Sequence, residues 1–140
     1  MSSYLVFKFR TVINSRTEWQ PVLCYSRSTD VYERFTNEIS IPYNKEDGEA
    51  DHIEVTIENV DSILEDVNKD IEKSSSVLHA LEKVIPNTDL NGYVSMVLEQ
   101  KNYLKELYEL KGRIITIKDI LIEVDEYGTC DFTGLYCTLE

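Results

Sequence analysis

Apolar residues recur at helical spacing through two long segments in the middle of the chain, roughly residues 58–85 and 89–111. Spacings of three and four positions place these residues on one face of an α-helix. Pro86 ends the first segment, because proline lacks the N–H that a helix interior needs. The pattern predicts an antiparallel helical hairpin. The residues expected to pack along it, or to mediate assembly, are Val67, Ile71, Leu78, Leu81, Val97, Leu104 and Leu107.

Individual residues predict where the two helices begin and end and whether the first helix is continuous. Asn59 or Asp61 is expected to cap the first helix, since side-chain oxygens accept hydrogen bonds from the free N–H groups of a first turn. The serine run 74–76 lowers intrinsic helicity, but the apolar stripe resumes in register at Val77, which predicts one continuous helix. Gly112 is expected to mark the end of the second helix.

The N-terminal part alternates with a period of two, as β-strands do. Residues 4–13 form the first predicted strand, residues 14–17 a turn, and residues 19–25 a returning strand whose Pro21 suits a sheet edge. Further on, residues 38–41 and 52–57 read as short strands, and residues 44–51 as an exposed loop between them. Residues 31–37 fit either a helix or a strand, and a helix capped by Asp30 is favoured.

The C-terminal part also reads as β-structure. Residues 113–127 are apolar on both faces of a period-two pattern, which predicts a strand inside a sheet. Residues 130–139 are expected to return as a last strand.

These elements predict an α+β fold with an antiparallel sheet built from N- and C-terminal segments and a long coiled-coil hairpin between them. A chain of 140 residues suits a single domain, residues 1–140, with one core. Within it, residues 58–112 are expected to project as a hairpin from a β-rich body of residues 1–57 and 113–140. At about 1.5 Å per residue, the helices are longer than the body requires.

The acidic balance narrows the choice of partners. The formal net charge is −12, and residues 44–66 alone hold nine acidic residues against one lysine, a net charge of −8. A field of this sign repels phosphate backbones and attracts basic proteins, so a protein partner is expected and a nucleic acid is not. The acidic residues expected to face such a partner are Glu46, Asp47, Glu49, Asp51, Glu54 and Glu58.

Patterns that support chemistry are absent from the sequence. The three cysteines show no CxxC spacing, the two histidines are scattered, and no phosphate-binding or nucleophile motif occurs. Cys24 lies in a strand pattern and is expected to pack in the core. We therefore expect no cofactor, no metal and no catalytic residue. Of three hypotheses about the function, the least favoured is a small enzyme or ligand binder in the β-rich part.

The favoured function is a non-enzymatic protein-interaction or assembly module that acts through its helical hairpin and forms a homo-oligomer. The alternative is an acidic inhibitor that presents residues 44–66 to a basic protein, as a mimic of nucleic acid would. Small viral (phage) accessory proteins often have this size and charge balance. With no secretory signal or membrane span in the sequence, the protein is expected in the cytoplasm, which for a viral protein is that of a host cell, without a membrane partner.

Overall fold

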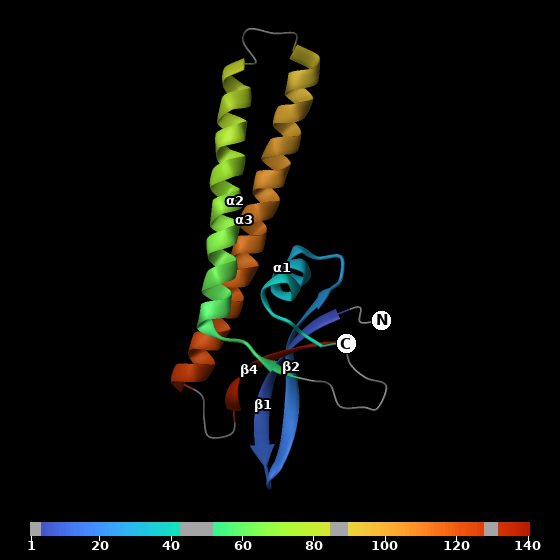
Figure 1. Cartoon of the computed structure of the whole chain (residues 1–140), viewed down its shortest axis with the longest axis vertical. Coiled ribbons are helices and arrows are strands. Elements are labelled where there is room, and N and C mark those ends of the chain that lie inside the picture. The colour runs from blue at the N-terminus through green and yellow to red at the C-terminus, as the bar shows by residue number, and fades with distance from the viewer. Residues whose placement is uncertain (1–3, 43–51, 85–89, 128–131) are drawn as a thin grey trace.

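The computed structural model describes residues 4–42, 52–84, 90–127 and 132–140. They form an α+β fold in which two long helices rise from a four-stranded antiparallel sheet (Figure 1). This is the predicted fold class. The predicted loop at residues 44–51, and the joint between the long helices at residues 86–88, lie outside the described residues.

The sheet joins the two ends of the chain, with strand order β2-β1-β4-β3. Strands β1 (Tyr4–Ile13) and β2 (Arg16–Ser26) form the predicted hairpin. Its turn has positive φ angles at Asn14 (50°) and Ser15 (66°), as a two-residue turn between twisted strands requires. Strand β4 (Phe132–Leu139) pairs antiparallel with β1 on the other side, which makes β1 an interior strand.

Pro21 lies in the edge strand β2, where the sequence places it. It pairs with Lys8, next to an irregularity in the register between Phe7 and Lys8. An edge position accommodates a residue that cannot donate a hydrogen bond to the sheet.

Residues 31–37 are helical, as favoured, and belong to α1 (Asp30–Glu38). The cap is Thr29 and not the expected Asp30, because the Thr29 hydroxyl accepts a hydrogen bond from the Tyr32 N–H at 3.4 Å. The predicted strand at residues 38–41 is wrong. Glu38 is still helical, and the Ile39 N–H donates to the Phe35 carbonyl as the helix ends.

The predicted strand at residues 52–57 is much shorter in the structure. Strand β3 comprises only Ile53–Glu54 and pairs with β4. Thr56 already caps helix α2 (Ile57–Val84). The Thr56 hydroxyl accepts from the Asn59 N–H at 3.2 Å, and the Asn59 side chain accepts from the Thr56 N–H at 3.3 Å. This reciprocal pair is a capping box, so the expectation that Asn59 or Asp61 is the cap is wrong.

Helix α3 (Leu90–Tyr127) overturns the predicted strand at residues 113–127. It runs through Gly112, where an added Cβ would meet nothing within 4 Å and the Thr116 hydroxyl donates to the Gly112 carbonyl. In its second half the buried positions are three or four residues apart, which is the helical period. Those positions are Leu107, Leu110, Ile114, Ile117 and Leu121.

The core lies between one face of the sheet and all three helices. Phe7 in β1 packs edge-on against Phe35 in α1, with ring centroids 5.1 Å apart. Figure 1 places α1 beside the lower half of the α2–α3 hairpin, and no other described element lies beside the upper half. None of the helices in the described ranges is long and apolar enough to cross a membrane.

Candidate interaction surface

Among the described residues, those of the upper half of the hairpin are not covered by α1 or the sheet (Figure 1). We define the distal hairpin as residues 74–84 of α2 and 92–103 of α3. It begins where α1 ends, since Arg34 of α1 pairs with Asp70 of α2 at 2.6 Å, one turn below Ser74. Each helix of the distal hairpin is about 17 Å long at a rise of about 1.5 Å per residue.

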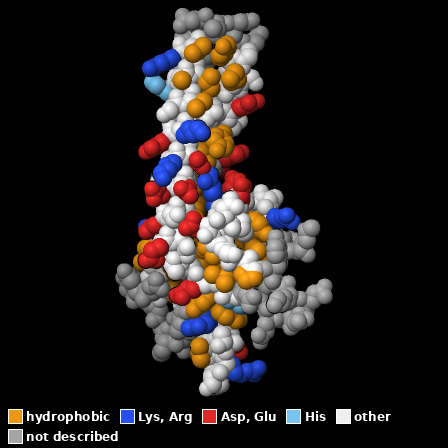
Figure 2. Space-filling view, in the orientation of Figure 1, with side chains coloured by type: hydrophobic (Ala, Val, Ile, Leu, Met, Phe, Trp, Pro, Cys, Tyr) orange, Lys and Arg blue, Asp and Glu red, His pale blue; other side chains and the backbone are white. Residues whose placement is uncertain are grey.

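Large hydrophobic side chains are exposed over this region. The described residues include eleven large hydrophobics that are exposed, and six of them belong to the distal hairpin. Figure 2 shows hydrophobic side chains gathered over the upper part of both helices. A contiguous exposed apolar patch is typical of an interaction site. The six residues are Val77, Val84, Val94, Met96, Leu98 and Tyr103.

Charge is scarce on the same surface. The distal hairpin has four charged side chains among its 23 residues, Glu82, Lys83, Glu99 and Lys101, so its net charge is zero. The entire net charge of −12 lies elsewhere in the chain. Long-range electrostatic attraction or repulsion is therefore weak at the distal hairpin.

A polar contact crosses the seam between the helices at the lower end of the distal hairpin. Ser74 is 3% exposed, and its hydroxyl and carbonyl oxygens accept hydrogen bonds from Gln100 Nε2 at 2.5 Å and 3.3 Å. A satisfied polar pair in an apolar seam fixes the register of the two helices. Lys101 and Glu82, 3.8 Å apart, connect the helices further along.

The seven predicted hairpin residues all lie in or beside the seam. Leu104 packs partly buried against the core. Leu78 and Leu81 are only half-buried, because above α1 each helix has a single neighbour. The four that are buried are Val67, Ile71, Val97 and Leu107. Their role in assembly stays a prediction.

The predicted acidic surface is only partly described. Glu54 lies on β3 and Glu58 in the first turn of α2, both exposed, whereas Glu46, Asp47, Glu49 and Asp51 lie outside the described residues. Further along the acidic segment, Asp61 pairs with Lys118 at 2.6 Å and Glu65 with Lys69 at 3.3 Å. These pairs reduce the negative field that a basic partner would meet.

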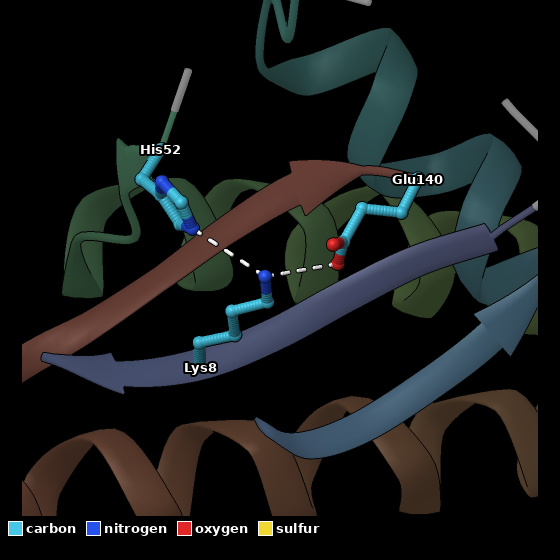
Figure 3. A network of polar contacts seen from close by, with 3 residues as sticks. All are labelled: Lys8, His52 and Glu140. Atoms are coloured by element: carbon cyan, nitrogen blue, oxygen red, sulfur yellow. Dashed lines mark hydrogen bonds and ion pairs between the residues drawn. The ribbon is translucent and has the colours of Figure 1, made fainter. Parts of the chain in front are cut away.

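A second polar feature lies on the sheet face opposite the helices (Figure 3). Lys8 Nζ is 3.0 Å from a carboxylate oxygen of Glu140 and 3.5 Å from His52 Nε2. Trp19 stacks on the His52 ring with centroids 3.7 Å apart and meets Tyr136 edge-on. The contacts connect the start of β3 and the end of the chain to β1. Lys8 is 8% exposed and contacts both Glu140 and His52, so we assign the cluster a structural role.

The cysteines differ in exposure, against the expectation for Cys24. Cys24 is exposed on the edge strand, so its predicted core position is wrong, whereas Cys137 is buried. Burial raises the pKa of the Cys137 thiol to about 12. Within the described ranges, no group of three or more His, Cys, Asp or Glu side chains could hold a metal ion.

This contrast predicts selective alkylation. Only a thiolate reacts, so at pH 8 iodoacetamide should modify Cys24 in the folded protein and leave Cys137 unmodified, because its thiol stays protonated well above that pH. Peptide mass spectrometry identifies the modified residue, and the same reaction in urea should modify both. Rapid modification of Cys137 without denaturant would contradict its burial.

Comparisons of the chain with protein-family models, with curated proteins and with solved structures gave no match.

Sequence reasoning missed two residues of the candidate surface, Met96 and Tyr103. Both lie off the predicted stripe of the second helix, yet each is about half exposed and apolar. The signal that could have found them is the presence of large apolar residues outside the seam positions of a helical hairpin, since a seam alone does not need them.

Proposed function

We propose that this protein is a non-enzymatic interaction or assembly module that binds another protein through the distal hairpin. One observation carries the proposal: a 23-residue region with no net charge holds six of the eleven exposed large hydrophobics among the described residues. Such a surface is costly to keep in water and gains free energy when a partner covers it. A cytoplasmic location is part of the proposal, supported by an odd number of cysteines and by the free Cys24 and Cys137.

The shared core of the lower part of the molecule supports this role. The sheet, α1 and the base of the hairpin share one core, while the distal hairpin extends beyond it with its own seam and the Ser74–Gln100 contact. A partner would therefore meet two preformed helices. A preformed surface loses little conformational entropy on binding.

The test compares two double variants in a pull-down from cells that produce the natural protein. Met96→Glu/Leu98→Glu places charges on two sides of α3, where the residues are 49% and 56% exposed. Val12→Glu/Ile13→Glu is the matched control at the tip of β1, at 44% and 50% exposure. We expect the first variant to retain at least about tenfold less of the partner protein than the wild type, which corresponds to a loss of about 1.4 kcal/mol in binding free energy. The control should retain as much as the wild type. Equal retention by both variants would contradict the proposal.

A further inference from the structure

Helix α1 divides one face of the hairpin into a covered and an open part. Tyr103 lines a depression of about 380 Å³ together with Arg34 and other residues of α1. Tyr103 also lines the next depression up the hairpin, of about 280 Å³, together with Val77 and Gln100. The two depressions therefore lie on the same face, which we call the α1 face.

The apolar stripe on this face continues upward past α1. Val84 follows Val77 by seven residues and Met96 precedes Tyr103 by seven, so each pair shares a side of its helix. All four are exposed, between 39% and 49%. Val94 and Leu98 lie on another side of α3, two residues from Met96 in either direction. The open stripe on the α1 face thus consists of Val77, Val84, Met96 and Tyr103.

A second copy of this chain is a suitable partner for the open stripe on the α1 face. Two copies present the same patch to each other about a two-fold axis, and the patch is mostly apolar. With a net charge of −12, two chains repel each other wherever their acidic parts meet, but the distal hairpin has no net charge. Two copies can therefore approach each other through the distal hairpin with the smallest electrostatic repulsion.

The position of α1 decides the orientation. In a parallel face-to-face pair, the two α1 helices would lie between the hairpins and hold the stripes apart. In an antiparallel pair, each distal hairpin lies on the open stripe of the other and ends near the other's α1. The acidic remainders of the two chains then lie at opposite ends of the particle, which lowers their mutual repulsion.

We infer that two copies of the chain pair antiparallel through their α1 faces, so that the four distal helices form a short bundle. This inference rests on the proposed function, for which it names the partner. The bundle is about three turns long and covers less than the roughly 800 Å² per partner of a typical stable complex. The dimer should therefore dissociate in the micromolar range, on the order of 10 µM.

Sedimentation equilibrium of the full chain between about 1 and 200 µM tests this inference, a range chosen to span that dissociation constant. The mass should rise from one chain of 16.2 kDa towards two. Val77→Glu/Met96→Glu should weaken the dimer at least about 30-fold, because charges would be buried in an apolar interface. The control Val94→Glu/Leu98→Glu, on another side of the helix, should keep the wild-type constant. Loss of the dimer in the control alone would overturn the choice of face.

Two further outcomes complete the test. Small-angle scattering should give the dimer a markedly greater maximum dimension than the Val77→Glu/Met96→Glu monomer, and an equal dimension would overturn the antiparallel order. A wild type that stays a monomer at the highest concentration would overturn pairing between copies. The proposed function would then still stand if Met96→Glu/Leu98→Glu lost retained proteins in the pull-down, and would fail with the inference if it did not.

Discussion

Replacing Ile114 by Asp is expected to unfold the protein, whereas the same change at the neighbouring Ile115 should cost less than about 1 kcal/mol. Ile114 is 0% exposed in the core, and Ile115 is 38% exposed on the other side of α3. A buried, unpaired carboxylate costs several kcal/mol in addition to the lost packing, which is comparable to the whole stability of a small domain. Urea denaturation followed by circular dichroism measures both.

The pair also tests the helix itself. On a strand buried on both faces, adjacent residues would both lose packing on substitution by Asp. Similar large losses at Ile114 and Ile115 would therefore contradict the helical assignment of residues 113–127.

Phe35→Ala should lower the free energy of unfolding by about 3–5 kcal/mol. Phe35 is fully buried and anchors α1 to the sheet through its edge-on contact with Phe7. Asn37→Ala, at an exposed position of the same helix, is the control and should change stability by less than about 0.5 kcal/mol. Loss of the Phe35 ring leaves a cavity between α1 and the sheet, which accounts for the expected cost.

The readout is the urea midpoint of the two variants and the wild type. A loss below about 1 kcal/mol for Phe35→Ala would show that α1 is not fixed to the core. The α1 face is defined by the position of α1 on the hairpin, so a different set of residues would then form it.

The fold class could be predicted because two kinds of pattern are unambiguous in this chain. Residues 4–13 alternate over ten positions before an Asn-Ser turn, and the first long helix keeps its stripe for seven turns. Both patterns are local, and tertiary contacts only reinforce them.

Residues 113–127 were not predictable in the same way, because the segment is apolar at nearly every second position and also at every third or fourth. β-branched Ile114, Ile115 and Ile117 favour a strand locally, and Gly112 resembles a helix end. The packing of α3 against α2, α1 and β4 selects the helical period. Tertiary burial overrides the local preference here.

The candidate surface was only half predictable. The sequence pattern predicts the hairpin, but helical spacing alone does not show that apolar residues such as Val94 and Leu98 are exposed. On the α1 face, Val77 and Met96 stay exposed because α1 ends below them, and the position of α1 is set by contacts such as Arg34–Asp70. No local pattern encodes such a contact between distant segments.

We propose that the exposed apolar residues of the distal hairpin serve a partner and not the fold of the single chain. The free energy of unfolding of Met96→Glu/Leu98→Glu and of the wild type, in urea at about 0.1 µM and so below the expected dissociation constant, tests this directly. We expect a difference below about 1 kcal/mol, because both side chains are about half exposed. A loss of about 3 kcal/mol or more would contradict it, since these residues would then stabilise the monomer itself.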